Sequence, residues 1–303
     1  MTASYNSVTT NVTPALHAAG SSHPPHITQA ELGRSLGTSA GLFELGAGQW
    51  PSTLGARDGG ESPSILIDLP SPGSVRAREI ISRSRTVATG KYPSWKTPDR
   101  LLHWESPEEA KAFRMLDACP AITRFTEQPF SIRYLHDGEW REHVPDVAFE
   151  TCFGGRGVLE IKSAVDRNLN DAVLRAKLLA PHFARAGCPY LLVHQHSLDA
   201  GRSLLNSREL LKVGRCPPSA RAHEQLLATL GDGKSIALSD LKRSRIDGVP
   251  ASHVAAQLAL RNYLTLTWPT FEKNEIRFST RSDENLKESL LWLLRAFGAI
   301  SPS

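Results

Sequence analysis

The chain has 303 residues, of which 40% are hydrophobic and 22% charged, and its formal net charge is +4 at pH 7. No apolar run approaches the roughly 20 residues needed to span a bilayer, which excludes a membrane-spanning protein and predicts no membrane contact. The four cysteines form no close pair, so a structural zinc site or a disulfide framework is not expected. With no secretory leader recognisable, the sequence predicts a cytoplasmic protein, and the mild positive charge is compatible with a polyanionic partner.

Residues 1–72 are rich in Ser, Thr, Gly, Pro and Ala and show no sustained periodicity. Such a composition buries too little apolar surface to offset the entropy of ordering, so we predict a mostly disordered N-terminal arm. Two apolar islands interrupt the arm, a short helix at 27–45 and a run at 65–69. Each is interpreted either as a chance island in a solvated tail or as a short docking motif.

Basic residues gather between positions 76 and 100, interleaved with Tyr92 and Trp95. This mixture suits phosphate contact combined with stacking on bases, although a solvated basic surface explains it equally well. The candidate DNA-binding side chains are Arg76, Arg78, Arg83, Arg85, Lys91 and Lys96.

A helix is predicted over residues 106–117, because Ser106 suits the N-cap and Pro107 the first helical position. Glu108 and Glu109 fall in its first turn, where the helix dipole favours acids. The two side chains point in directions about 100° apart, so Glu108 is expected to face solvent.

The middle of the chain alternates between strand and helix signals. An Asp-Gly turn predicts one hairpin and a Gly-rich turn at 153–157 predicts the next, after which the apolar period changes from two to about 3.6. The predicted elements are strands at 130–135, 142–149 and 157–163, a helix at 168–186 and a strand at 189–194. This order predicts an α/β fold, a mixed sheet flanked by helices.

The last part of the chain is predicted to be a separate unit in which three helices precede a strand pair, the order of a winged helix. The third helix is the prospective recognition helix, but its His253, Gln257 and Arg261 are sparse for base reading, so DNA contact and protein contact both remain open. A final helix is expected to pack beneath the unit. The elements are helices at 221–230, 239–243 and 252–262, strands at 264–268 and 275–279, and a helix carrying Leu286, Leu290, Leu293, Leu294 and Phe297.

The clearest chemistry lies in the second hairpin. Alternation places Glu160 and Lys162 on one face of their strand, and Leu159 and Ile161 enter the core. Asp146 begins the neighbouring strand, so these carboxylates and the ammonium group converge at one edge of the sheet. Phosphodiester hydrolysis needs a hard cation because charge gathers on oxygen in the transition state, and carboxylates suit Mg²⁺ or Mn²⁺.

This pattern predicts a hydrolytic metal site with Asp146 and Glu160 as ligands and the backbone carbonyl of Ile161 as a third. Lys162 would orient or help deprotonate the attacking water, or neutralise the phosphate. Glu109 would bind a second metal ion or hold the first through water.

Two further residues are weighed near the site. Gln128 would either hydrogen-bond the shell of metal-bound water or DNA, or simply end a loop. His143 is expected to be an exposed strand residue rather than a base.

Four stretches extend this pattern: Trp104-Glu105-Ser106-Pro107-Glu108-Glu109; Phe113, Pro120 and Ile122 with Glu127-Gln128-Pro129; Pro145-Asp146; and Leu159-Glu160-Ile161-Lys162. Together they resemble the TnsA family, the endonuclease subunits of heteromeric transposases within the PD-(D/E)xK nuclease superfamily. The similarity covers approximately residues 76–210.

The resemblance implies that Glu109, Asp146 and Glu160 are the three acids of a catalytic site and that Lys162 is its lysine. The third position varies between Gln and Glu in the family. The implied activity is a Mg²⁺-dependent or Mn²⁺-dependent DNA endonuclease that cleaves the 5′ side of transposon ends.

The resemblance also implies an architecture and a set of partners. A restriction-endonuclease-like PD-(D/E)xK core is expected over residues 73–203 and a winged-helix C-terminal domain over 204–303. The implied partners are double-stranded DNA at the transposon ends, a DDE-type transposase subunit and an AAA+ ATPase regulator, which would place the protein at the bacterial nucleoid. The long N-terminal arm departs from the family pattern.

Two alternatives remain open. The first is a restriction or repair nuclease of the same fold. The second is a non-catalytic DNA-binding or assembly protein of the transposition machinery, against which the intact set of Asp, Glu and Lys argues.

Overall fold

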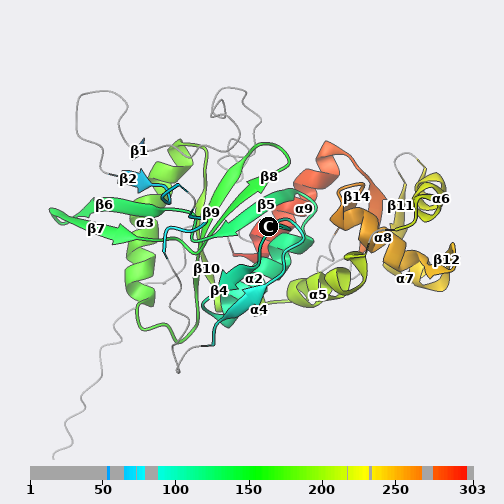
Figure 1. Ribbon diagram of the computed structural model, residues 1–303, viewed down its shortest axis with the longest axis horizontal. Coiled ribbons are helices and arrows are strands. Elements are labelled where there is room, and N and C mark those ends of the chain that lie inside the picture. Colours follow the sequence, from blue (N-terminus) through cyan, green and yellow to red (C-terminus); the bar gives the residue numbers. More distant parts are fainter. Residues whose placement is uncertain are drawn as a thin grey trace, which may run out of the picture.

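The computed structural model describes residues 53–54, 65–72, 74–78, 88–216, 218–231, 234–267 and 276–298. These parts of the chain form a mixed α/β structure with several sheets (Figure 1). Several predictions fall outside them: most of the N-terminal arm, the helix at 27–45, and the candidate DNA contacts Arg83 and Arg85.

A four-stranded mixed sheet organises the first unit. Its strands are β5 (Ile122–Glu127), β8 (Val147–Thr151), β9 (Arg156–Lys162) and β10 (Tyr190–His194). Their order is β10-β9-β8-β5, in which β9 and β10 are parallel and the other pairs are antiparallel. The predicted hairpin between β8 and β9 is confirmed, and Gly154 turns it at φ 78°. The sequence did not predict β5, whose burial pattern is irregular and whose register shifts between Ile122 and Arg124.

Helices cover both faces of this sheet. Leu159 and Ile161 of β9 enter a core shared with α2 (Pro107–Ala118) and α9 (Asp283–Ala296), whereas Val158 enters a second core beneath α3 (Leu169–Arg185). The three helices lie on either side of the strands in Figure 1. Because side chains alternate along a strand, Glu160 and Lys162 are directed to the α3 face.

A second sheet, ordered β1-β2-β6-β7, corrects two predictions. Its strands are β1 (Thr53–Leu54), β2 (Ile65–Asp68), β6 (Ser131–His136) and β7 (Glu139–His143). Disorder through residue 72 is wrong for β2, because Ile65 and Ile67 alternate into the α3 core while the backbone pairs with β6. The predicted strand at 142–149 is two strands, β7 and β8, in different sheets. Pro145 lies between them and cannot donate a ladder hydrogen bond.

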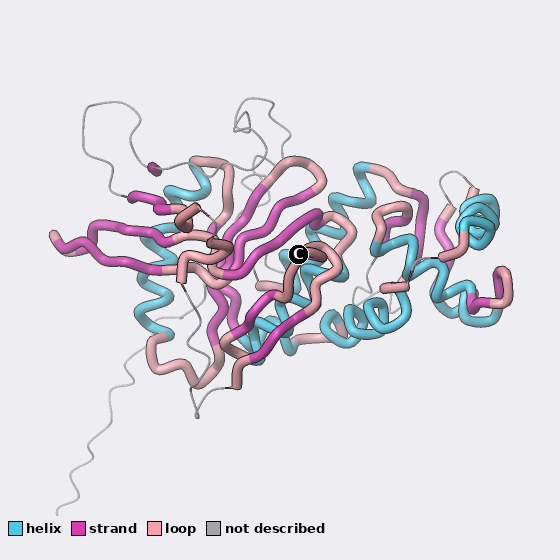
Figure 2. Tube along the Cα trace, viewed as in Figure 1, coloured by secondary structure: helices cyan, strands magenta, loops and turns pink. Residues whose placement is uncertain are grey.

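The C-terminal unit is mostly helical, in contrast to the strand-rich first unit (Figure 2). Its strands β11, β15 and β14 form one sheet in that order. The elements are α5 (Ser203–Gly214), α6 (Ala220–Leu230), β11 (Ser235–Ala237), α7 (Leu238–Arg243), β12 (Arg245–Ile246), β13 (Val249–Pro250), α8 (Ala251–Leu260), β14 (Leu264–Thr267) and β15 (Arg277–Thr280). The predicted helices and strand pair are thus present, with α5 and β11 in addition.

Helix α8 is buried in the C-terminal unit and does not expose a face to a partner. Every residue of it except His253 is buried. It crosses α5 so closely that a Cβ at Gly214 would lie 2.9 Å from the carbonyl oxygen of Ala256. The Gln257 amide donates to Val213 and the Arg261 guanidinium donates to Gly214 and Arg215. Gln257 and Arg261, two of the three candidate base-reading residues, therefore hold α8 against α5.

Helix α9 joins the two units. Its Leu290, Leu293 and Leu294 are buried in the core of the first unit, although Ser289 Oγ donates to the carbonyl of Leu266 in β14 at 2.7 Å. The expectation that α9 packs beneath the C-terminal unit is therefore confirmed by its contact with β14, and the helix in addition packs on the core of the first unit. Within the described chain, no helix has the length and apolar character that crossing a membrane requires. The remaining elements are β3 (Gly90–Tyr92), β4 (Leu102–Trp104) and α4 (Gln195–Asp199).

Candidate active site

Asp146 is fixed where β8 begins. Its N–H donates to the carbonyl of Leu159 at 3.1 Å, and its Oδ2 accepts from the Ile161 N–H at 2.6 Å. The Asp146 carboxylate therefore bonds to the backbone of β9 at Ile161, two residues beyond Leu159, which forms the last β8–β9 pair with Val147. No described residue donates a hydrogen bond to Oδ1, which leaves that oxygen available to a ligand.

Glu109 reaches the same region from the first turn of α2. The Ser106 side chain caps the helix by accepting from the Glu109 N–H at 3.1 Å. In return, the Glu109 carboxylate accepts from Ser106 Oγ at 2.9 Å and from the Glu105 N–H at 2.9 Å. This capping arrangement orients Glu109, and each carboxylate oxygen keeps a lone pair beyond these bonds.

Glu109 and Asp146 are electrostatically close. Burial, followed by the negative charge of Asp146, raises the pKa of Glu109 to about 8. Burial likewise raises the pKa of Asp146 to about 6, although Lys162 and the Ile161 N–H act in the opposite direction. A buried and a half-buried acid that retain their charge poorly are stabilised by a cation between them.

Glu160 has a different environment. Its side chain is fully buried, and Tyr190 Oη donates to Oε2 at 2.6 Å. Arg175 of α3 donates from Nε to Oε2 at 3.2 Å and from Nη2 to Oε1. Burial raises the pKa of Glu160, but His143, Arg175 and Lys162 outweigh it and hold the pKa below its ordinary value. Glu160, which was expected at an edge of the sheet, is therefore a buried carboxylate whose charge is neutralised by neighbouring cations.

Lys162 lies beside Glu160 and Asp166. Its Nζ is 3.6 Å from Glu160 Oε1 and 3.6 Å from Asp166 Oδ2, and its charge lowers the pKa of Asp146. Glu109 interacts electrostatically with Asp146, and Asp146 with Glu160 and Lys162, although the four predicted catalytic residues come from α2, β9 and the loop before β8.

The fit to a metal ion can be tested on these groups. Among the described residues, no three His, Cys, Asp or Glu side chains are gathered closely enough to hold a metal, so the predicted three-acid cluster is not formed. Glu109 and Asp146 supply uncompensated oxygen ligands of the type that Mg²⁺ and Mn²⁺ prefer. The Ile161 carbonyl lies on the same side of β9 as its N–H, which faces Asp146. These donors fit a hard cation, whereas Glu160 is already paired.

His143 is another correction. It was expected to be exposed, but its side chain is only 13% exposed and its Nε2 lies 3.4 Å from Glu160 Oε2. Burial lowers its pKa to about 4, so the imidazole is neutral at physiological pH. His143 is the last residue of β7 and the only one of that strand that is not exposed.

Two other side chains also differ from expectation or stay open. Glu108, expected in solvent, is buried and lies 3.8 Å from the Lys111 ammonium. Gln128 donates from its N–H to the Asp146 carbonyl at 2.9 Å and holds a positive φ of 45°. Its Oε1 is buried with no hydrogen-bond partner among the described residues. Such strain beside Asp146 is compatible with the predicted contact to metal-bound water, which stays a prediction.

The candidate DNA-binding residues differ in their burial and in their partners. Lys96 is taken up by the fold: its Nζ donates to the carbonyls of Leu116 and Cys119 at the end of α2, and burial lowers its pKa to about 8. Arg78 pairs with Glu105, whereas Lys91 is exposed. Arg76 is half-buried. Of the four described candidates, Lys96 is therefore held inside the fold, whereas Arg78 and Lys91 are exposed.

Arg175 and Tyr190 were missed by sequence reasoning. Arg175 falls between Ala172 and Leu179, which are buried at helical spacing on the inner face of α3. An arginine inside an apolar stripe was the signal available, because a cation at such a position needs a buried acid.

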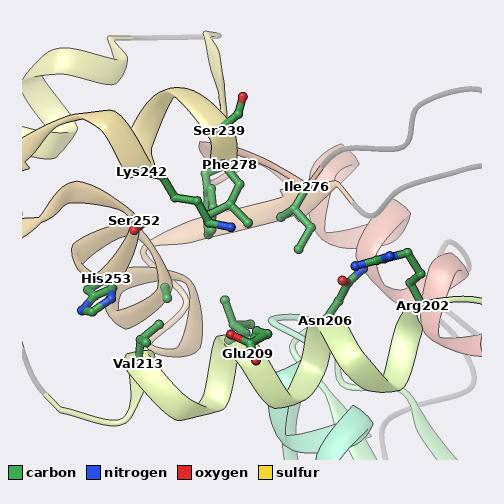
Figure 3. Close-up of a pocket in the computed structure, with 13 residues that line it drawn as sticks. Arg202, Asn206, Glu209, Val213, Ser239, Lys242, Ser252, His253, Ile276 and Phe278 are labelled. Carbon is green, nitrogen blue, oxygen red and sulfur yellow. The ribbon is translucent and has the colours of Figure 1, made fainter.

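A separate cleft of about 520 Å³ lies between α5, α7, α8 and β15. Figure 3 shows Arg202 at one end and His253 at the other, with Lys242 reaching toward the middle from α7. Leu210, Ile276 and Phe278 give the cleft an apolar floor. It is remote in the chain from Asp146 and contains no predicted catalytic residue.

Comparison of the chain with models of known protein families, and with curated proteins, gives no match.

Proposed function

We propose that this protein is a metal-dependent DNA endonuclease of the PD-(D/E)xK type, and specifically a TnsA-like transposase subunit that cleaves the 5′ side of transposon ends. The observation that carries the proposal is the 2.6 Å bond from the Ile161 N–H to Asp146 Oδ2. It joins the Pro-Asp segment to the centre of the Glu-Ile-Lys segment, within electrostatic reach of both Lys162 and Glu109.

Asp146, Glu109 and the Ile161 carbonyl would hold Mg²⁺ or Mn²⁺ in this proposal. When bound, the ion would supply Lewis acidity toward a phosphodiester oxygen. Lys162 contributes a positive charge beside these groups, where it can orient water or compensate negative charge that develops on the phosphate. The neutral His143 lies too deep, against Glu160, to serve as the first proton acceptor.

The C-terminal unit is proposed to be a winged-helix domain used mainly for protein contact. The order α6, β11, α7, α8, β14 and β15, with three strands in one sheet, supports the winged-helix assignment. The burial of α8 favours protein contact over groove reading, because no free helix face remains to enter DNA.

The proposed partners are the transposon-end DNA, a DDE-type transposase subunit and an AAA+ ATPase regulator, in the bacterial cytoplasm. The cleft in Figure 3 is suited to receive a protein segment, since it combines apolar side chains with cationic Arg202 and Lys242. DNA contact is assigned to Lys91, Arg76 and Arg78 of the described residues.

The test is Mn²⁺-dependent nicking of supercoiled plasmid by the full chain, with and without transposase. Asp146→Ala is expected to lower the rate at least about 100-fold, because it removes the carboxylate that the Ile161 N–H holds at the proposed metal site. Arg185→Gln, on the exposed part of α3, is the matched control and keeps the wild-type rate. Equal cleavage by wild type and Asp146→Ala, or no cleavage with transposase and Mn²⁺ present, contradicts the proposal.

The same site would serve a restriction or repair nuclease of this fold. A requirement for a DDE transposase in the nicking assay separates the two, because a restriction or repair enzyme cuts without it. A protein that binds DNA equally well with and without Mn²⁺ and never nicks it would be the non-catalytic assembly protein.

A further inference from the structure

We propose that the free edge of strand β7 binds a second copy of this chain, the two β7 strands pairing in antiparallel fashion about a twofold axis at Trp140. The pairing joins the two β1-β2-β6-β7 sheets into one continuous sheet. This inference goes beyond the proposed function and does not depend on it.

Strand β7 is the last strand of its sheet, and the β6–β7 hairpin extends on the side of the first unit opposite the C-terminal unit (Figure 1). Within the described chain, the only strand that pairs with β7 is β6. The first four residues of β7 are exposed. An exposed edge of this kind is a template for pairing with a further strand, because one row of its backbone groups has no strand partner.

Two large apolar side chains lie uncovered beside this edge. Leu135 and Trp140 are directly opposite each other in the β6–β7 register, so both project to the same face of the sheet. They are 41% and 53% exposed. The opposite face carries Ile132 and Tyr134 into the α3 core. A second copy paired along β7 continues the row with its own tryptophan and leucine, and cross-strand neighbours of this kind stabilise a sheet.

The turn of the hairpin determines which backbone groups of β7 face outward. Asp137 and Gly138 form a two-residue turn with φ values of 53° and 79°, and His136 pairs with Glu139 across it. The pair that closes such a turn is hydrogen-bonded, and bonded and non-bonded pairs then alternate along the ladder. The N–H and C=O groups of Trp140 therefore point away from β6, as do those two residues further on.

Charge selects one of the three registers in which these outward groups can meet about a twofold axis. If Trp140 faces Glu142 of the second copy, the two Arg141 side chains oppose each other. If Glu142 faces Glu142, two carboxylates oppose each other. Like charges in direct opposition destabilise a strand pair. If Trp140 faces Trp140, however, Glu139 faces Arg141 of the second copy, and symmetry repeats this contact.

The selected register also suits the shape of the hairpin. Each turn ends opposite Glu142 of the second copy, so the two hairpins overlap only along the exposed part of β7. Glu139 and Arg141 are exposed, and neither forms an ion pair within the described part of the chain. Charges on an edge strand ordinarily prevent pairing with other strands. Here their order makes them complementary to a second copy.

The experiment measures the monomer–dimer dissociation constant of the full chain by sedimentation velocity over a range of protein concentrations. Wild type is expected to form a reversible dimer. Arg141→Glu makes the four facing side chains acidic, and Glu139→Arg makes them basic, so each variant alone raises the dissociation constant at least about tenfold. Glu142→Gln is the matched control and keeps the wild-type constant, because Glu142 faces the glycine of the turn.

An equimolar mixture of Arg141→Glu and Glu139→Arg is the decisive measurement. In a mixed pair every acidic side chain faces a basic one, so the mixture is expected to recover the wild-type dissociation constant. A variant that had merely failed to fold would not recover on mixing. Trp140→Ala removes the centre of the apolar row and is expected to weaken the dimer about tenfold.

Three results would each overturn the inference. One is a wild-type protein that stays monomeric at every concentration. Another is a dimer that neither charge reversal weakens, since the two copies then meet through a different surface. The third is a mixture that associates no more strongly than each variant alone.

Discussion

The two ends of helix α2 carry buried acids in opposite circumstances. At the C-terminal end, Asp117 is fully buried and accepts from Tyr92 Oη at 2.9 Å, Ser94 Oγ at 2.8 Å and the Trp95 N–H at 2.9 Å. At the N-terminal end, Glu109 faces a second acid, Asp146, and no arginine or lysine contacts it within the described chain.

The helix dipole alone predicts that Glu109 is better stabilised than Asp117, because the dipole favours acids at the N-terminus and disfavours them at the C-terminus. Asp117 is nevertheless satisfied, with Arg215 of the C-terminal unit 3.7 Å away and the Lys96 ammonium capping the neighbouring carbonyls. The comparison teaches that a buried acid surrounded by donors holds the fold together. A buried acid beside another acid needs a ligand from outside, which is the reason for assigning function to Glu109 and not to Asp117.

The largest effect is expected from Asp117→Ala. It leaves three buried donors and Arg215 without their acceptor, and removing one partner of a buried charged network costs about 3–5 kcal/mol. The thermal midpoint should fall by on the order of 10 °C, while Asp117→Asn, which retains one acceptor, falls less. A loss below about 1 kcal/mol would show that Asp117 is not structural.

Glu109→Gln is expected to act in the opposite direction. The amide keeps a partner for Ser106 and the Glu105 N–H but removes the repulsion from Asp146, so the metal-free protein gains about 1 kcal/mol of unfolding free energy. The same variant loses most of the Mn²⁺-induced stabilisation. Urea unfolding without Mn²⁺ measures the gain in stability, and unfolding with Mn²⁺ measures the lost stabilisation by the ion. A metal-free variant less stable than wild type would contradict the repulsion between Glu109 and Asp146.

A further effect is a pH dependence that belongs to Glu109. Its folded-state pKa is raised from an ordinary value of 4.5 to about 8, so the folded protein binds the proton more tightly than the unfolded chain. Its contribution to stability is therefore fully present below pH 4.5 and is lost as the pH rises toward 8. The difference in unfolding free energy between wild type and Glu109→Gln should widen over this interval. Mn²⁺ affinity should rise over the same interval, because the ion competes with the proton.

The sequence predicted local features well. The Ser106 cap, the Asp-Gly turn at 137–138 and the period of α3 each depend on a few neighbouring residues, and all are present in the structure. It also indicated that Leu159 and Ile161 enter the core while Glu160 and Lys162 face away from it, since alternation along a strand is a local property.

Tertiary structure decided which distant parts of the chain these residues contact. β5 and β2 were missed or assigned to disorder because their stability comes from pairing with strands far away in the chain. The packing of α3 on the sheet brings Arg175 to Glu160, and the packing of α5 on α8 removes the prospective recognition face. Local pattern therefore determined which residues carry charge and toward which face they point, whereas long-range packing determined which charges are already matched.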